Sequence, residues 1–477
     1  MGLLIKNGEI VTAADRFVAD VYCDGGTVAA IGANLEKRGA KDEVLDASAQ
    51  LVLPGFIDPH VHMELPFMGT VSADDFETGT ASGVAGGTTC IIDFCIPARG
   101  ESLLKGLETW RERSRKAVAD YAFHMAITGW SDRTADEMRA VVQQHGITSF
   151  KVFMAYKGAI MVDDGELYQV MKQAAKLGAV VAVHAENGDV VFNLQKELVA
   201  AGQLGPEFHP VSRPSCVEGE ATERALMMAA LHGTRTYIVH MTCKESVAAL
   251  ERAKLRGQKC YGETCPQYLL LDDRVFVKPD FEGAAYVMSP PIRPPHIGHH
   301  DALWTGLTTG MLDSVGTDHC PFTMEQKRMG KDNFTLIPNG AAGVEDRLQL
   351  LYTYGVCEGR FDVQKMVALG ATNPAKIFGL YPRKGTIAVG GDADIVLYDP
   401  SSRGTRSAKT HHSRADRNIF EGFKVSGKPT HVIVGGRVRY RDGKLDVERG
   451  AGRFIEREVA RHSAPVAAGA AADARAR

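Results

Sequence analysis

The middle of the chain alternates short apolar runs with stretches of helical periodicity, and this alternation limits the possible folds more than any other feature. Segments with apolar residues at helical spacing, such as 167–177, 221–231 and 246–255, separate the runs. Eight strand-then-helix units predict a (β/α)8 barrel, a TIM-like α/β fold. A doubly wound open sheet remains the alternative at this point. The eight apolar runs occupy 56–61, 89–94, 122–127, 149–154, 180–183, 236–239, 259–261 and 312–315.

The two ends of the chain have a different pattern, which predicts β structure. Asn7-Gly8 and Asp24-Gly25-Gly26 are turn signals near the start, and strand-like runs return at 393–398, 431–434 and 437–440. We therefore predict that residues 1–54 and 379–455 fold together as a small β-sandwich beside a catalytic barrel at 55–378. Residues 456–477 are rich in alanine and lack an apolar stripe, so we expect a disordered tail.

The composition excludes several classes of protein. The 477 residues are 44% hydrophobic and 24% charged, with a net charge of −3, so bulk charge predicts neither a nucleic-acid partner nor a membrane surface. No apolar run approaches the roughly 18 residues that span a bilayer. The nine cysteines form no CxxC pair, and the first residues lack a signal-peptide pattern. We therefore expect a cytoplasmic protein with reduced thiols.

Several apolar runs carry residues with the chemistry of a metal site, mostly where the run ends. In a β/α barrel the carboxyl ends of the strands face the active site. His60 and His62 close the first run, and because alternate residues of a strand point the same way, both imidazoles can reach one cation. Their convergence at one rim with the others predicts a metal centre. The others lie in or at the end of four separate runs, and they are Lys151, His184, His240 and Asp318.

Lys151 does not fit a simple set of metal ligands, because an ammonium cannot bind a cation. One interpretation is a buried lysine paired with a carboxylate. The other is a lysine carbamylated by carbon dioxide, whose two anionic oxygens could bridge two cations about 3.5–4 Å apart. The residues alone leave both interpretations open.

Five segments of the sequence resemble the dihydropyrimidinase and D-hydantoinase family of the amidohydrolase superfamily. The resemblance extends from residue 4 to about residue 455, and late in the chain it includes 381–385 (YPRKG) and 409–412 (KTHH). It implies a (β/α)8 barrel, a homotetramer, and hydrolysis of cyclic amides at a centre of two divalent cations, zinc above all, with manganese or cobalt as alternatives. The five segments are 54–62 (PGFIDPHVH), 149–157 (SFKVFMAYK), 184–187 (HAEN), 316–322 (GTDHCPF) and 337–340 (IPNG).

The resemblance also implies a role for each candidate residue. His60, His62 and Asp318 would hold one cation, and His184 and His240 the other, with carboxylated Lys151 and a hydroxide bridging them. Asp318 would move the proton from the attacking hydroxide to the departing ring nitrogen. Tyr156 would donate its hydroxyl to the carbonyl oxygen under attack. Ser289 and Asn339 would hold the ring amide through their main-chain groups.

The substrates implied are 5,6-dihydrouracil and dihydrothymine, opened to N-carbamoyl-β-amino acids, and 5-substituted hydantoins, opened to N-carbamoyl amino acids. Leu65 and Phe153, with Phe67, suggest an apolar wall for an uncharged ring substituent. Allantoinases and dihydroorotases are similar and remain alternatives. Dihydroorotases typically have an arginine two residues after the second histidine, where this chain has Glu64. A scaffold protein without metal ligands is a further alternative, and a serine hydrolase is not indicated because no GxSxG motif occurs.

Three other histidine features invite separate interpretations. We expect His411-His412 to lie exposed outside the barrel and His299-His300 to lie in a loop. His319 follows Asp318 but should point elsewhere, with indirect support of the metal ligands as the alternative.

Overall fold

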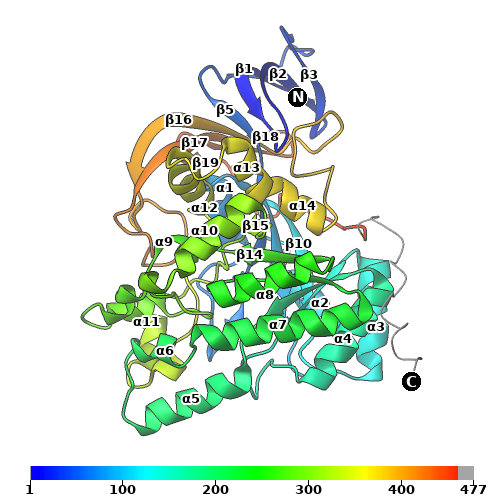
Figure 1. Ribbon diagram of the computed structural model, residues 1–477. Coiled ribbons are helices and arrows are strands. Elements are labelled where there is room, and N and C mark those ends of the chain that lie inside the picture. Colours follow the sequence, from blue (N-terminus) through cyan, green and yellow to red (C-terminus); the bar gives the residue numbers. More distant parts are fainter. Residues whose placement is uncertain (1, 460–477) are drawn as a thin grey trace.

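The computed structural model describes residues 2–459, and its central feature is a barrel of eight parallel strands (Figure 1). Neighbouring strands pair in the order β15-β14-β13-β12-β11-β10-β9-β6. A parallel bridge between Val61 and His319 joins the two edges. The predicted barrel is therefore confirmed over the open-sheet alternative. The strands are β6 (Phe56–Val61), β9 (Thr88–Cys95), β10 (Asp120–Ala126), β11 (Ser149–Phe153), β12 (Val180–His184), β13 (Arg235–Ile238), β14 (Cys260–Thr264) and β15 (Ser314–Val315).

Helices cover the outside of the barrel, and their ends follow ordinary capping rules. For α4, Asp163 accepts the N–H of Glu166 in a capping box, and Gly178 ends the helix with a φ of 66°. The three helical segments taken from the sequence lie within α4, α7 and α8. The main helices are α1 (Phe76–Ala85), α2 (Leu103–Ser114), α3 (Asp132–His145), α4 (Asp164–Leu177), α5 (Gly188–Ala200), α7 (Ser215–His232), α8 (Lys244–Leu255) and α10 (His299–Thr309).

Shorter helices lie between these elements. They are α6 (Phe208–Val211), α9 (Pro266–Leu270), α11 (Met324–Lys327), α12 (Arg347–Leu350), α13 (Val363–Val367) and α14 (Asn373–Ile377). Not all are at the carboxyl end of the barrel: Nδ2 of Asn373 in α14 donates to the carbonyl of Asp313, just before β15, at 2.7 Å. A short hairpin of β7 (Pro66–Phe67) and β8 (Thr70–Val71) follows β6.

Both ends of the chain contribute strands to one sheet, as predicted (Figure 1, blue and orange). The order is β19-β18-β17-β16-β5-β1-β2-β3, with β4 paired to β1. Some of its buried side chains form a core of their own, and others, such as Leu53 and Val396, belong to the main core. The division into units at residues 54, 378 and 455 stays a prediction. The strands are β1 (Leu3–Val11), β2 (Arg16–Asp24), β3 (Thr27–Gly32), β4 (Glu43–Asp46), β5 (Leu51–Pro54), β16 (Ile395–Thr405), β17 (Lys424–Val434), β18 (Arg437–Arg441) and β19 (Lys444–Leu445).

Two expectations about this part of the chain are corrected. Asn7-Gly8 is not a hairpin turn but an irregularity inside β1, because Asn7 adopts a φ of 63° and its N–H donates to Asp20 at 2.9 Å. The start of the expected disordered tail is ordered, since Arg457 is buried and its N–H donates to the carbonyl of Gly146 at 2.8 Å. Residues 460–477 lie outside the described residues.

Candidate metal and active site

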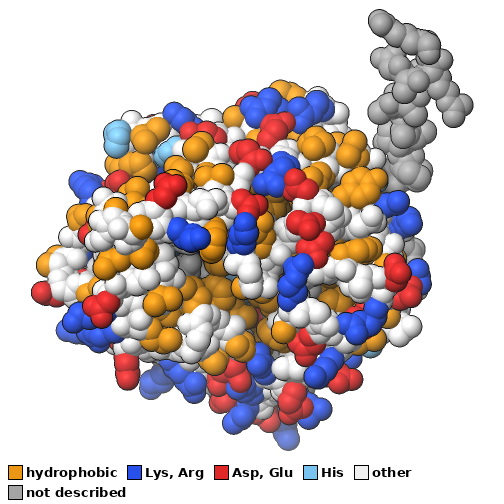
Figure 2. Space-filling view, turned by 90° about the horizontal axis from the view of Figure 1, so that it is seen from below, with side chains coloured by type: hydrophobic (Ala, Val, Ile, Leu, Met, Phe, Trp, Pro, Cys, Tyr) orange, Lys and Arg blue, Asp and Glu red, His pale blue; other side chains and the backbone are white. Residues whose placement is uncertain are grey.

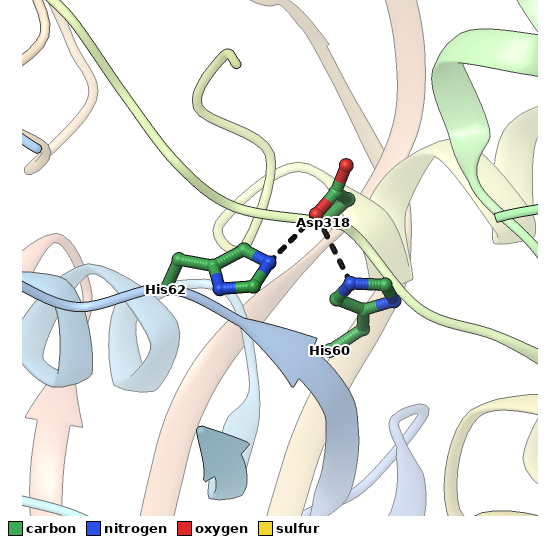
Figure 3. A group of neighbouring side chains, drawn as sticks. All are labelled: His60, His62 and Asp318. Carbon is green, nitrogen blue, oxygen red and sulfur yellow. Dashed lines mark ion pairs between the residues drawn. The ribbon is translucent and has the colours of Figure 1, made fainter. Parts of the chain in front are cut away.

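His60, His62 and Asp318 meet at the carboxyl end of the barrel (Figure 3). His60 belongs to β6 and His62 follows it, so the two imidazoles point to the same side, as the strand period requires. Oδ1 of Asp318, three residues beyond β15, lies 3.1 Å from Nε2 of each histidine. Three potential ligand groups therefore converge on one point from opposite edges of the barrel sheet.

His184 and His240 bring a second pair of imidazoles to the same place. His184 ends β12 and His240 follows β13, and Nδ1 of His184 lies 3.0 Å from Nε2 of His240. The rings of His60 and His240 have centroids 5.2 Å apart, so the two groups are adjacent. All four predicted histidines thus line one cavity together with Lys151 and Asp318.

Lys151 is completely buried in β11, and its ammonium has no hydrogen-bond partner among the described residues. Its Nζ lies 4.9 Å and 5.0 Å from the ring centres of Phe94 and Phe153. No carboxylate within residues 2–459 forms an ion pair with it, which argues against the first interpretation of this lysine. Burial lowers its pKa to about 7, which favours the uncharged amine that carbon dioxide requires.

Two buried glutamates, Glu263 and Glu186, contact the imidazoles of His60 and His184. The sequence alone assigned no role to either glutamate. Oε1 of Glu263 lies 2.7 Å from Nδ1 of His60, and Oε2 of Glu186 lies 2.7 Å from Nε2 of His184. Glu186 also accepts from Arg213 at 2.6 Å. Glu186 lies within a segment that carried the family resemblance, so that segment offered a signal. Glu263 lies two residues beyond an apolar run that the sequence ended too early.

Tyr156, Ser289 and Asn339 line the same cavity. The Tyr156 ring lies edge-on to Phe67, with ring centres 5.4 Å apart, and burial raises the pKa of Tyr156 to about 12. Its hydroxyl therefore stays protonated at neutral pH and is available as a donor. The Nδ2 atom of Asn339 donates to Oγ of Ser289 at 2.9 Å.

Leu65, Phe67 and Phe153 line the cavity, together with Ile96 and Ile160, which sequence reasoning missed. These two lie in loops between barrel elements, where no periodic pattern marks a residue as facing a cavity. Glu64 faces away from the cavity: its Oε2 lies 2.6 Å from Nζ of Lys116.

Three of the candidate residues have strained main-chain conformations. The φ angles of Tyr156, His240 and Asp318 are 67°, 39° and 53°, in the left-handed region that side chains other than glycine rarely adopt. Such strain persists where the surrounding structure holds it, and it concentrates at functional sites.

The negative charge around the cavity and the unpaired polar atoms inside it are both consistent with bound cations. Burial alone would lower the pKa of His60, but the charges of Glu263 and Asp318 outweigh it and raise that pKa to about 9, which indicates a strongly negative environment. Among the described residues, Nδ1 of His240 and Nζ of Lys151 are buried without a hydrogen-bond partner. Buried polar atoms rarely remain unpaired, and imidazole nitrogens of this kind suit divalent metals.

The remaining histidines lie outside this cavity. The imidazole of His319 lies 3.0 Å from Asp74 and contacts none of the candidate ligands, although its carbonyl accepts the N–H of His62 at 2.8 Å. The loop predicted for His299-His300 is wrong: both begin α10, and His299 is buried. The exposed position predicted for His411-His412 is also wrong, because both are only partly exposed and Nδ1 of His412 lies 3.1 Å from Glu345.

Comparison with known proteins identifies the family. Residues 51–439 match the model of the amidohydrolase family. The chain belongs to this family. A D-hydantoinase from Geobacillus stearothermophilus is 47% identical over 96% of the chain and 97% of its own length. A dihydropyrimidinase from Arabidopsis thaliana is 45% identical over 95% of the chain and 85% of its own length.

Solved structures agree with this assignment. The amidohydrolase superposes on a dihydropyrimidinase from Brevibacillus agri with a TM-score of 0.95 and 46% identity, covering 97% of this chain and 100% of that one. An L-hydantoinase from Arthrobacter aurescens gives a TM-score of 0.86 at 31% identity, covering 95% of this chain and 99% of that one. The predicted family and fold are thereby confirmed, and the amidohydrolase is an enzyme. None of the helices within residues 2–459 has the length and apolar character needed to cross a membrane.

Proposed function

We propose that this amidohydrolase opens cyclic amides by hydrolysis: 5,6-dihydropyrimidines to N-carbamoyl-β-amino acids, and 5-substituted hydantoins to N-carbamoyl amino acids. The observation that carries the proposal is the convergence of four imidazoles, one carboxylate and one buried lysine at the carboxyl end of the barrel. The names of its relatives, D-hydantoinase and dihydropyrimidinase, support the choice of substrate class.

Two divalent cations, for which we propose Zn²⁺, fit the residues present. His60, His62 and Asp318 would hold one, and His184 and His240 the other. Lys151 would contribute to both after its uncharged amine adds to carbon dioxide and releases a proton, which leaves an N-carboxylate. When bound, the two cations would supply a water of lowered pKa and polarise the ring carbonyl.

Asp318 and Tyr156 would carry the remaining steps. Oδ1 of Asp318 lies within 3.1 Å of both His60 and His62, at the centre of the ligand group, where it can take a proton from the attacking water and return it to the departing ring nitrogen. The Tyr156 hydroxyl, kept protonated by burial, can donate to the carbonyl oxygen as negative charge develops on it.

Recognition of the ring would fall to Ser289, Asn339 and the apolar wall. Within residues 2–459, no hydrogen bond involves the main-chain N–H or C=O of Ser289 or Asn339, and both residues line the cavity. These amide groups can pair with the N–H and C=O groups of a cyclic amide. Leu65 and Phe153 would pack against an uncharged substituent, which makes a 5-substituted hydantoin or a dihydropyrimidine suitable.

Dihydroorotate is a less suitable substrate because its carboxylate would need a cationic partner. Among the described residues that line the cavity there is no arginine, and Glu64, at the position where dihydroorotases have one, pairs with Lys116 instead. Allantoin, a hydantoin with a polar substituent, would meet the apolar wall formed by Leu65 and Phe153.

Turnover of a substrate panel together with metal counting tests the proposal. Purified enzyme should hydrolyse dihydrouracil, dihydrothymine or a 5-substituted hydantoin faster than allantoin or dihydroorotate, and should contain two divalent metals per chain. Asp318→Asn should lose about 10²–10⁴-fold in kcat. Asp136→Asn, an exposed change on α3, is the matched control. A preference for dihydroorotate, or protein without stoichiometric metal, would contradict the proposal.

We also propose that the enzyme is a cytoplasmic homotetramer. All nine cysteines are free thiols, which suits a reducing compartment. Figure 2 shows hydrophobic side chains in patches between interspersed charges of both signs. Exposed apolar residues on α5, α7 and α8, such as Phe192, Leu231 and Leu255, offer area for contact between copies. Light scattering coupled to size-exclusion chromatography should give four times the chain mass, and a monomer would contradict the tetramer.

A further inference from the structure

Lys327, at the end of α11, has an unusual set of partners. Its side chain is buried, and its Nζ donates to three main-chain carbonyls: Val287 at 2.8 Å, Pro338 at 2.7 Å and Gly340 at 2.8 Å. No ion pair links it to a carboxylate within residues 2–459. An ammonium has three N–H donors, so each one has its own carbonyl acceptor.

The three carbonyls belong to two separate loops that meet at the cavity. Val287 lies two residues before Ser289, whereas Pro338 and Gly340 flank Asn339 on either side. A fourth bond ties the loops together, because the N–H of Gly340 donates to the carbonyl of Val287 at 3.0 Å. Lys327 therefore cross-links the two segments that carry Ser289 and Asn339.

In both loops, the residues next to Ser289 and Asn339 differ from these two in their main-chain hydrogen bonds. The carbonyls beside Ser289 and Asn339 are occupied by buried side chains: Lys327 takes those of Pro338 and Gly340, and Nε2 of His209 lies 2.8 Å from the carbonyl of Met288. The main-chain groups of Ser289 and Asn339 themselves have no hydrogen-bond partner among the described residues, and both residues line the cavity.

The loop around Gly340 has little freedom to compensate for a loss of these bonds. Gly340 has a φ of 143°, and a Cβ there would lie 2.3 Å from the carbonyl oxygen of Cys320. The segment therefore packs against the residues just after Asp318, and its position depends on the bonds that hold it from the other side.

We infer that Lys327 is a positioning residue for substrate recognition. It holds the main chain of Ser289 and Asn339 in the position in which their unpaired N–H and C=O groups can hydrogen-bond to the ring of a cyclic amide. The inference rests on the proposed function. A buried amine is costly unless its N–H groups are hydrogen-bonded, and a methionine of similar shape would avoid that cost. The three carbonyls reach the Nζ of Lys327 only where the two loops come together, so these hydrogen bonds favour that arrangement.

The test compares Lys327→Met with a matched control, Lys254→Met. Lys254 also binds main-chain carbonyls, those of Gly310 and Met311, but just before β15, at the end of that strand opposite Asp318. For the best substrate of the panel, Lys327→Met should lower kcat/KM about 10²-fold, mostly by raising KM, with metal content unchanged. Lys254→Met should leave KM within about twofold of the wild type.

Lys327→Gln, which keeps two of the N–H donors, should give an intermediate KM and protects the test against a misfolded Lys327→Met variant. A folded, metal-loaded Lys327→Met enzyme with the wild-type KM would overturn the inference. So would failure of both Lys327 variants to fold, because Lys327 would then serve general stability. Failure of the proposed function is distinguishable, since the wild-type enzyme itself would then open no cyclic amide.

Discussion

Oε1 of Glu263 lies 2.7 Å from Nδ1 of His60, and the same oxygen accepts the main-chain N–H of His240 at 3.0 Å. The Glu263 carboxylate thus orients the ring of His60, a proposed ligand of one cation. It also holds the main chain of His240, a proposed ligand of the other cation. Its second oxygen accepts the hydroxyl of Tyr237 at 2.8 Å, so the glutamate is held at both ends. Groups of this kind set the orientation and basicity of metal ligands.

Substitution of Glu263 should therefore weaken metal binding without removing a ligand. Gln can keep an oxygen toward His60 and loses only the charge, so Glu263→Gln should lower metal affinity about 10-fold, and Glu263→Ala up to about 100-fold. Competition with a chelator, followed by metal analysis, measures the change. Glu223→Gln, a change at a partly exposed position on α7, is the control. Equal affinities for wild type and Glu263→Ala would remove Glu263 from this role.

Tyr156→Phe tests the proposed donor to the carbonyl oxygen. Phenylalanine keeps the ring contacts with Phe67 and His184, whose centres lie 5.4 Å and 5.3 Å from that of Tyr156, so only the hydroxyl is lost. We expect kcat to fall about 10²–10³-fold with little change in KM. Tyr168→Phe, at an exposed position on α4, should change neither parameter. An unaltered kcat for Tyr156→Phe would make Tyr156 a packing residue of the rim.

The positions of the candidate ligands could be predicted because strands carry a simple signal. His60, His62, His184 and Asp318 come at or just after the ends of apolar runs, and a barrel brings those ends together whatever the loops do. The roles of Glu263 and Lys327 could not be predicted in the same way. Each acts through contacts with residues distant in the chain, and a bond to a main-chain carbonyl leaves no pattern in the sequence.

Local signals failed where tertiary contacts decided the outcome. Asn-Gly is a strong hairpin signal, but Asp20 binds the Asn7 N–H and β1 continues past it. His299 follows a proline-rich stretch that suggested a loop, yet it begins α10 and is buried near Glu245, with Nδ1 3.6 Å from Oε2.

Lys384→Met should destabilise the enzyme strongly. The ammonium of Lys384 is buried between Asp120, Asp392 and Asp394, at 2.7, 3.0 and 2.5 Å, and Asp120 begins β10, far along the strand from the cavity. The three carboxylates could hold a metal ion by their spacing, but the lysine occupies that position. Removing it leaves buried charges that Arg453 only partly offsets.

We expect the free energy of unfolding to fall by about 3–5 kcal/mol, which urea unfolding of the two proteins measures. Lys376→Met, at an exposed position on α14, should change it by less than about 0.5 kcal/mol. A second change, Asp394→Asn, should restore part of the loss in Lys384→Met. Unchanged stability of Lys384→Met would show that this cluster is not compensated by the lysine.

His412 should make stability depend on pH. Its hydrogen bond with Glu345 raises the pKa of the imidazole above its usual 6.5. The folded state therefore holds the proton more tightly, and the contribution is fully present below pH 6.5 and is lost as pH rises through the folded-state pKa. For a partly exposed pair we expect about 0.5–1 kcal/mol, or about 1–2 °C in melting temperature.

Melting curves of wild type and His412→Gln should differ most at pH 6 and converge at alkaline pH. A gap between wild type and His412→Gln that widens as pH rises would contradict the assignment.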